Sequence, residues 1–326
     1  MTESAGAWPV IVFLVQQMWY FSIPLLIVAL GGMFSERAGV INIALEGIMV
    51  MGAFCSLFLI NRLQNVMSGQ ALLAIGLLTA AGSGMLFTLP HAYASINLRS
   101  DQTISGTALN MAAPAIAIFV ARTFQENHLQ QVQFNDTFRL VSVPVLGDIP
   151  IIGPLLFKNT YITTFLGFIL LIVAAVVLYK TKFGLRLRAC GEHPQAADSV
   201  GVNVYRVRYA GVLISGALAG IGGLVFVIPT STVFNATVSG YGFLALAVLI
   251  FGQWRPVRVF FAALFFGLMK TIASAYSGVP VLKSLPIPSD IYKMIPYITT
   301  LVALALTSKH SQAPRASGQP YDQGSR

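Results

Sequence analysis

Long apolar runs, separated by short polar segments, make up almost the whole chain. A helix that crosses a bilayer needs about 20 mostly apolar residues, and fewer where it is broken and buried among neighbouring helices. The pattern therefore predicts an all-α polytopic membrane protein with about nine transmembrane segments, some of them short or broken, packed in one bundle. The predicted segments span approximately Pro9–Gly32, Gly47–Ile60, Ala71–Leu89, Ile104–Ala121, Tyr161–Tyr179, Tyr209–Ile228, Tyr241–Gly252, Val257–Tyr276 and Ile291–Thr307.

The composition agrees with this class. Of the 326 residues, 56% are hydrophobic and only 10% are charged, whereas a typical soluble domain has about 25% charged residues. So few charges cannot cover a water-exposed surface, and a soluble globular protein is excluded. The two cysteines, Cys55 and Cys190, fall in an apolar run and in a polar loop, so no disulfide is expected between them.

Basic residues predict the orientation of the bundle. The loop at residues 180–208, between the fifth and sixth apolar segments, is short and basic, and such loops stay in the cytoplasm. This places the N-terminus outside and the C-terminus inside, and membrane topology then explains the net charge of +9 better than nucleic-acid binding does. The basic residues of the loop are Lys180, Lys182, Arg186, Arg188, Arg206 and Arg208.

The predicted domain organisation is a single transmembrane domain over residues 1–307, followed by a polar cytoplasmic tail at 308–326. An external loop spans 122–160, and its Pro- and Gly-rich part, Val143–Pro154, is expected to be irregular or strand-like. It could act as a gate or docking surface, or it could be a passive connector. The tail is too polar to be buried and is expected to be extended or disordered on its own.

The basic loop carries more structure than a connector needs. Glu192, Ala196, Ala197 and Gly201 can form a short helix that ends at a glycine. A helix held at the cytoplasmic surface of a membrane protein can dock another protein. The pattern therefore suggests that the chain is one part of a larger assembly.

A polar interruption at Gly31–Gly47 lies between the first two apolar segments and contains Asn42 and Glu46. Irregular backbone at membrane depth is tolerated where protein or a water-filled cavity surrounds it, and transporters build their sites from such interrupted helices. Asn42 and Glu46 are therefore candidates for the translocation path. The alternative is an ordinary short loop in which Glu36 and Arg37 are solvated.

A second interruption, Asn97–Asn110, precedes and enters the fourth apolar segment. Asn110 is the third candidate for the translocation path, because an amide that donates and accepts suits a polar substrate. The alternative is a capped helix start, with Asn110 bonded to a neighbouring helix. All three candidates could brace helices instead, and Glu46 could pair with Arg37.

Motifs for catalysis are absent from the sequence. There is no GxxxxGK[ST] nucleotide-binding loop, no GxSxG or HExxH motif, and the four histidines show no metal-ligand spacing. We therefore predict no catalytic residue, no cofactor, no metal site and no enzymatic activity of the chain itself.

Four stretches of the chain carry a family resemblance: FSERAGVINIALEGIMVMGAF (34–54), ISGTALNMAAP (104–114), GLRLRACGEHPQAADSVGVNVYRVRYAGVLISGALAGIGG (184–223) and APRASGQPYDQG (313–324). In these stretches the chain resembles the inner-membrane permease subunits of bacterial ABC importers for nucleosides and simple sugars. The tail stretch points to the nucleoside branch, whose permeases work with basic-membrane-protein-type binding lipoproteins.

This resemblance implies a location and a set of partners. The chain would be a multi-pass protein of the bacterial cytoplasmic (inner) membrane. It would assemble with ATP-binding subunits that hydrolyse ATP, a second related permease and an external substrate-binding lipoprotein. Ala196–Gly201 would dock into the ATPase, flanked by Glu192, and Phe34–Gly47 would be a broken helix near the path of the nucleoside substrate.

Other functions remain open from the sequence. A ribose-like sugar permease differs from a nucleoside permease by a few hydrogen bonds in the pocket. A stand-alone ion-coupled transporter would need inverted repeats or internal carboxylates for coupling, and no convincing repeat is found. A membrane enzyme is disfavoured because no catalytic constellation is present.

Overall fold

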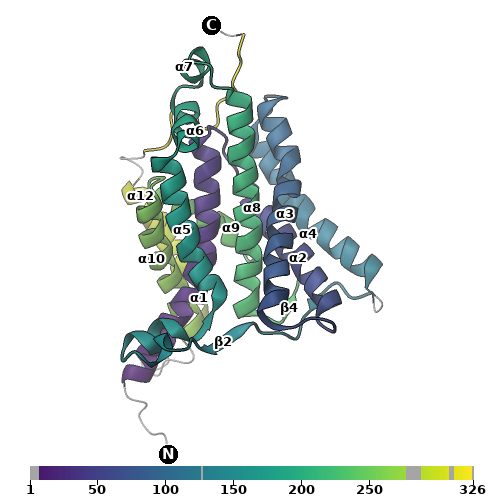
Figure 1. Ribbon diagram of the computed structural model, residues 1–326, viewed down its shortest axis with the longest axis vertical. Coiled ribbons are helices and arrows are strands. Elements are labelled where there is room, and N and C mark those ends of the chain that lie inside the picture. Colours follow the sequence, from purple (N-terminus) through teal and green to yellow (C-terminus); the bar gives the residue numbers. More distant parts are fainter. Residues whose placement is uncertain (1–6, 126–127, 277–287, 308–311, 325–326) are drawn as a thin grey trace, which may run out of the picture.

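The computed structural model describes residues 7–125, 128–276, 288–307 and 312–324. The chain folds into an elongated helical bundle whose two termini lie at opposite ends (Figure 1). Its helices are α1 (Ala7–Arg37), α2 (Leu45–Leu63), α3 (Gly69–Ile96), α4 (Gln102–Phe124), α5 (Ile162–Lys180), α6 (Lys182–Glu192), α7 (Pro194–Ser199), α8 (Val204–Thr230), α9 (Tyr241–Phe251), α10 (Pro256–Ala275) and α12 (Ser289–Thr307).

The predicted class is confirmed, and the predicted number of spans is not. Each of the nine predicted segments overlaps a helix. Within the described residues, however, only seven helices are both long and apolar enough to cross a membrane: α1, α2, α3, α4, α5, α8 and α10. Helix α9 has only 11 residues, too few to cross a hydrocarbon core about 30 Å thick.

Helix α8 is the central helix of the bundle and packs against α1, α2 and α3. Small residues permit this close packing. Gly220 touches the backbone of α3, and a Cβ atom on it would clash with the Ala80 carbonyl oxygen; a Cβ atom on Gly52 of α2 would clash with the Gly220 backbone. The small-residue pattern at Gly216 and Gly220 is therefore a helix-packing motif.

Short strands lie at the end of the bundle opposite α6 and α7 (Figure 1). Here β1 (Val132–Gln133) pairs antiparallel with β4 (Val233–Phe234), and β2 (Arg139–Ser142) pairs antiparallel with β3 (Lys158–Tyr161). A 3₁₀ turn, η1 (Leu146–Asp148), and a π turn, η2 (Gly153–Phe157), lie between β2 and β3. The expectation of irregular backbone at Val143–Pro154 is confirmed. We call this the strand end of the molecule.

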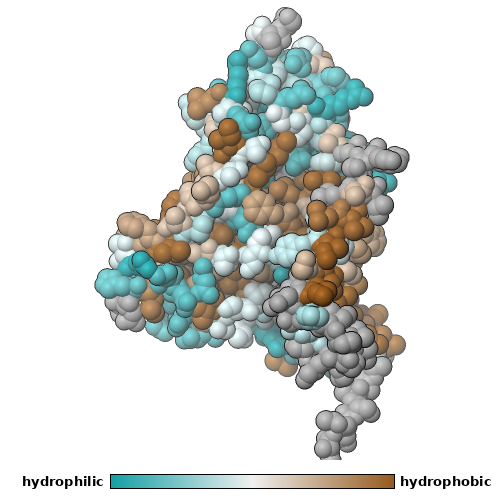
Figure 2. Space-filling view, turned by 180° about the vertical axis from the view of Figure 1, so that it is seen from behind, coloured by the Kyte–Doolittle hydropathy of each residue, from teal (hydrophilic) through white to brown (hydrophobic). Residues whose placement is uncertain are grey.

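The opposite end carries α6, α7 and the C-terminal residues, and we call it the α6–α7 end. Its surface is mostly hydrophilic, and hydrophobic side chains gather further along the bundle (Figure 2). The C-terminal residues 312–324 pack onto this end. The Ala316 N–H donates to the Gly191 carbonyl at 2.8 Å, the Gly318 N–H donates to the Gly39 carbonyl at 3.3 Å, and Ala316 and Tyr321 are buried.

The expectation of a tail too polar to be buried was therefore wrong for Pro314, Ala316 and Tyr321, while seven of the thirteen residues at 312–324 are exposed and the segment contains no helix or strand, as an extended tail would. Backbone hydrogen bonds and one buried aromatic ring hold the segment in place, and hydropathy reports neither of them.

Candidate functional site

The basic loop forms two short helices at the α6–α7 end. Helix α6 begins after Thr181, whose hydroxyl accepts a hydrogen bond from the Gly184 N–H at 3.1 Å. It ends at Glu192, and α7 begins at Pro194. The prediction of a single short helix containing Glu192 was wrong, because proline disfavours helical backbone in the residue before it and has no N–H to continue the ladder.

Helix α7 ends at a glycine, as predicted. Gly201 has a positive φ of 84°, and its N–H donates to the Asp198 carbonyl at 2.8 Å, while the Val202 N–H donates to the Ala197 carbonyl at 3.1 Å. These bonds close the helix with a left-handed residue, a conformation that glycine adopts without strain.

The two alanines of α7 face different environments. Ala197 is buried and belongs to the core, whereas Ala196 is exposed. Gln195, Ser199 and Val200 are also exposed, and 78% of Val200 is accessible to solvent. Gln195, Ala196, Ser199 and Val200 therefore form an exposed face on α7 and at its end, and the buried Ala197 lies behind this face.

Cys190 lies on the inner side of α6 and is fully buried. Burial raises the pKa of the Cys190 thiol to about 11, so the thiol stays protonated and unreactive at neutral pH. Cys190 is therefore a packing residue of this end.

The C-terminal segment packs against the start of α8, which the sequence did not predict. The Tyr321 ring packs edge-on against Tyr205 with ring centroids 5.5 Å apart, and Arg208 donates to the Gln319 carbonyl at 3.0 Å. Asp322 forms a two-bond ion pair with Arg99, each bond 2.8 Å. The segment thereby joins α8 to the turn between α3 and α4.

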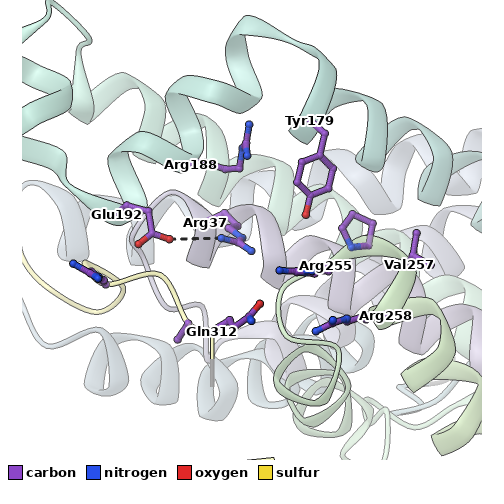
Figure 3. A pocket seen from close by; sticks show the side chains of 11 residues that line it. Arg37, Tyr179, Arg188, Glu192, Arg255, Val257, Arg258 and Gln312 are labelled. Carbon is purple, nitrogen blue, oxygen red and sulfur yellow. Dashed lines mark ion pairs between the residues drawn. The ribbon is translucent and has the colours of Figure 1, made fainter. Parts of the chain in front are cut away.

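A surface cavity of about 850 Å³ opens beside α6 and contains several arginine side chains (Figure 3). Arg37, the last residue of α1, lies at its edge. One guanidinium nitrogen of Arg37 is 3.7 Å from a Glu192 carboxylate oxygen, and another donates to the Trp254 carbonyl at 3.1 Å. The end of α1 is thus tied both to α6 and to the turn between α9 and α10.

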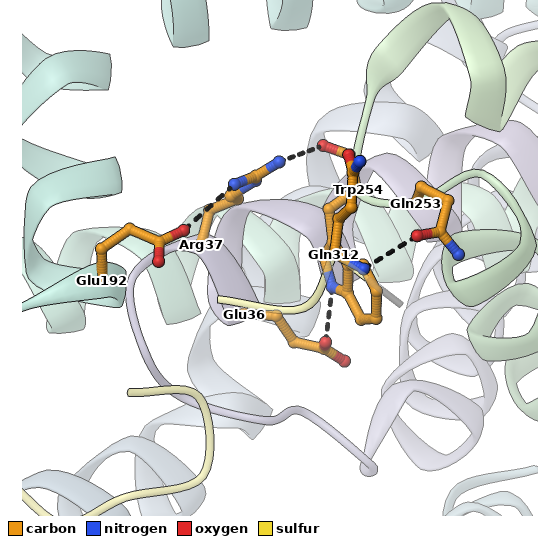
Figure 4. Close-up of polar contacts among 6 residues, drawn as sticks. All are labelled: Glu36, Arg37, Glu192, Gln253, Trp254 and Gln312. Atoms are coloured by element: carbon orange, nitrogen blue, oxygen red, sulfur yellow. Dashed lines mark hydrogen bonds and ion pairs between the residues drawn. The ribbon is translucent and has the colours of Figure 1, made fainter. Parts of the chain in front are cut away.

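A second set of bonds strengthens this junction (Figure 4). The Trp254 indole N–H donates to the buried Glu36 carboxylate at 2.6 Å, and the Gln253 side-chain oxygen accepts from the Gln312 N–H at 2.8 Å. The alternative in which Glu36 and Arg37 belong to an ordinary solvated loop is therefore wrong. So is the suggested pairing of Glu46 with Arg37.

The interruption between α1 and α2 is a buried break in the helical backbone. Residues 38–44 are buried or half-buried, and neighbouring side chains satisfy their backbone groups. The Ile41 N–H donates to the Gln102 side-chain oxygen at 2.7 Å, and His91 Nε2 lies 3.0 Å from the Ile41 carbonyl. Irregular backbone surrounded by protein in this way is the arrangement expected of a functional interrupted helix.

Glu46, one of the three candidates for the translocation path, joins the starts of two helices. Its carboxylate oxygens accept from the N–H groups of Gly240 and Gly242, at 2.8 and 2.6 Å. Helix α9 begins at Tyr241, so the carboxylate lies at the positive end of that helix dipole. Glu46 therefore holds the short helix α9 against α2.

Asn110 and Asn42, the other candidates, also bond to neighbouring elements. Asn110 accepts from the Gly47 N–H at 2.7 Å and donates to the Ile43 carbonyl at 2.9 Å. Asn42 is fully buried and donates to the Ser215 hydroxyl at 2.9 Å. Among the described residues its side-chain oxygen has no hydrogen-bond partner.

Helix α4 is capped as the alternative for this region expected: the Asp101 carboxylate accepts from the Thr103 N–H at 2.6 Å. The three candidates thus lie at the start of α2 or bond to it or to the break before it, where α2 packs against α4, α8 and α9. All three brace this region, and Asn42 alone keeps a free acceptor within the described part of the chain. Their role in the translocation path stays a prediction.

The chain is similar to several known permeases. It is 43% identical over 94% of its length to the guanosine ABC transporter permease protein NupQ of Bacillus subtilis, covering 95% of that protein. It is 42% identical over 94% of its length to the nucleoside ABC transporter permease protein NupC of Lactococcus lactis, covering 96% of it.

A more distant relative is the putative glucose ABC transporter permease protein TsgC13 of Haloferax volcanii, which is 29% identical over 89% of the chain and 90% of that protein. No solved structure matches the chain significantly. Residues 14–304 match the family described as "Branched-chain amino acid transport system / permease component". The chain, a bundle of apolar helices with a buried break between α1 and α2, belongs to this family of transport permeases.

Proposed function

We propose that the chain is the permease subunit of an ABC importer that moves nucleosides into the cytoplasm. The observation that carries this proposal is the near-full-length similarity to two permeases named for guanosine and nucleoside transport, at 43% and 42% identity. A simple-sugar substrate is the second candidate, supported by the 29% identical permease named for glucose. The higher identity favours nucleosides.

The proposed orientation places the α6–α7 end in the cytoplasm of a bacterial cell and the strand end outside. Its support is the basic loop at 180–208, because short basic loops are retained in the cytoplasm. The exposed Ser199 provides a test. Ser199→Cys should resist an impermeant thiol reagent applied to intact cells and react after the membrane is opened. Labelling from outside would indicate the opposite orientation, with the α6–α7 end outside the cell.

Separate ATP-binding subunits would dock on the face formed by Gln195, Ala196, Ser199 and Val200. The contacts behind this face support a coupling role. Helix α7 follows α6 directly, and α6 is joined to the end of α1 through Glu192 and Arg37. A displacement of α7 by an ATPase would therefore be transmitted to the end of α1, immediately before the buried break that leads to α2.

The path would run beside the break, where Asn42 and Glu46 lie. Opening such a path requires elements there to separate, and the bonds from Glu46 to the start of α9 would have to break in that step. The free Asn42 oxygen could accept a hydrogen bond from a ribose hydroxyl or a base N–H. A second related permease would complete the channel, and an external binding lipoprotein would deliver the nucleoside at the strand end.

Competition for uptake tests the substrate class. Cells that express the complete transporter would take up labelled guanosine in the presence of an excess of unlabelled uridine, ribose or glucose. We expect uridine to reduce guanosine uptake and both sugars to leave it unchanged. Competition by ribose or glucose, without competition by uridine, would favour the sugar permease.

A further inference from the structure

The cavity beside α6 has an unusual concentration of positive charge. Among its lining residues are five arginines, from the end of α1, from α6, from the start of α10 and from the C-terminal segment, and one carboxylate. The carboxylate, Glu192, lies 3.7 Å from Arg37. The described contacts thus provide one anionic partner for five cations. The arginines are Arg37, Arg188, Arg255, Arg258 and Arg315.

The arginines retain donors for a ligand. The Nε atom of Arg188 is buried and has no hydrogen-bond partner among the described residues, while its guanidinium lies 5.2 Å above the Tyr179 ring. Arg255, Arg258 and Arg315 are exposed, and Figure 3 shows Arg255 and Arg258 on the side of the cavity that faces Arg37. A buried donor without an acceptor is costly, and like charges held together repel. An anion in the cavity would relieve the repulsion between the arginines.

An exposed apolar surface adjoins the cavity. Tyr179 and Val257 line it and are 44% and 61% exposed. From Tyr179 the exposed positions continue along α5 at Val176 and Ile172, and from Val257 they continue along α10 at Phe261 and Phe265. These positions recur at three- or four-residue intervals, so they form one stripe on each spanning helix. The cavity therefore lies where two exposed apolar stripes reach the charged end of the bundle.

We propose that this cavity binds the phosphate headgroup of an anionic phospholipid, whose acyl chains lie along the stripes on α5 and α10. Guanidinium groups bind phosphate oxygens through paired charge-assisted hydrogen bonds, and basic pockets between transmembrane helices suit anionic lipid headgroups. A soluble phosphate would use only the arginines, and an acidic peptide would not use stripes on membrane-spanning helices. An anionic lipid uses both features.

Bound lipid would join four parts of the α6–α7 end. The arginines come from α1, α6, the start of α10 and the segment after Gln312, and two of these elements, α1 and α6, also support the proposed coupling face. The lipid would neutralise the charge that these elements bring together and hold them in one arrangement. The inference goes beyond transport itself and does not depend on the substrate.

Lipid retention by the purified full-length chain tests the proposal. The chain would be titrated with phosphatidylglycerol or with phosphatidylethanolamine in detergent micelles, and bound lipid counted by native mass spectrometry. The Arg255→Gln/Arg258→Gln variant should bind phosphatidylglycerol at least about tenfold more weakly, because two charged donors are lost. Arg186→Gln/Arg206→Gln is the matched control, since it removes the same charge from exposed residues outside the cavity, and it should bind normally.

Three results would overturn the proposal: equal weakening in the two double variants, equal retention of phosphatidylethanolamine, or displacement of the lipid by millimolar inorganic phosphate, which would indicate a site for a soluble anion.

A second measurement leaves the arginines in place. Trp254 is buried next to Arg255, and the other two tryptophans can be changed by Trp8→Phe/Trp19→Phe. Brominated phosphatidylglycerol should quench Trp254 fluorescence more strongly than brominated phosphatidylcholine, and equal quenching would contradict the site.

Discussion

The carboxylate of Glu46, in the first turn of α2, accepts a 2.6 Å hydrogen bond from the N–H of Gly242, in the first turn of α9. Gly242 must be a glycine, because a Cβ atom there would clash with the Glu46 backbone. The hydrogen bond thereby holds the start of α2 against the start of α9 within the bundle. A negative charge at the start of α9 also satisfies N–H groups that have no partner within that helix.

Removing the Glu46 carboxylate should therefore loosen α9. Glu46→Ala leaves the N–H groups of Gly240 and Gly242 without acceptors, and the expected loss is roughly 2 kcal/mol or more in the free energy of unfolding. Thermal unfolding of the purified protein measures this loss. Glu192→Ala is the control, because that carboxylate is 43% exposed and its removal should cost little. Equal effects of the two substitutions would contradict the role assigned to Glu46.

Asn42 and Asn110 should respond differently to the same substitution. Asn110→Leu leaves the Gly47 N–H and the Ile43 carbonyl unpaired, at roughly 1–3 kcal/mol each, so it should impair folding or assembly. Asn42→Leu breaks one side-chain bond, so assembly should survive while the rate or substrate preference of uptake changes. Expression, co-purification and uptake would be measured for both variants. If Asn42→Leu also fails to assemble, Asn42 acts only as a brace and has no role in the translocation path.

Substitutions of the exposed Ala196 and the buried Ala197 should have different effects, the first on docking of the ATP-binding subunit and the second on folding of α7. Ala196→Glu adds a charge to an exposed position, so the protein should remain folded but lose the ATP-binding subunit in a pull-down, because a charge at a closely packed interface is costly to desolvate. Ala197→Glu buries a charge and should destabilise α7 itself. Thr137→Glu, exposed at the strand end, is the control. Normal association of the Ala196→Glu variant would contradict the assignment of the docking face to α7.

Tyr321 should determine whether the C-terminal segment stays on the α6–α7 end. Its ring is buried, and Tyr321→Ala should cost on the order of 3 kcal/mol of segment binding. Limited trypsin digestion would then cleave after the exposed Arg315 much faster than in the unaltered protein. Gln319→Ala is the control, because Gln319 contributes its backbone carbonyl to the bond with Arg208. Unchanged cleavage of the Tyr321→Ala variant would contradict the anchoring role.

The spanning helices could be predicted from the sequence because apolar runs report directly on burial in lipid. The glycine end of α7 was also predictable, since Gly201 follows a short polar helix. Pro194 is the signal in the sequence that separates Glu192 from α7. The partners of Glu46 and Asn110 are backbone groups of distant residues, which no local pattern reveals. The anchoring of the C-terminal segment depends likewise on bonds to Gly39 and Gly191.

Uptake of labelled guanosine tests the central claim most directly. Cells lacking the gene for this chain, but retaining its proposed partners, would be complemented with the unaltered chain or with the Ala196→Glu variant. We predict that the unaltered chain restores guanosine uptake and that the Ala196→Glu variant, present in the membrane at the same level, does not. Failure of the unaltered chain to restore uptake would contradict its role as a nucleoside permease. Equal restoration by both chains would contradict the docking of the ATP-binding subunit on α7.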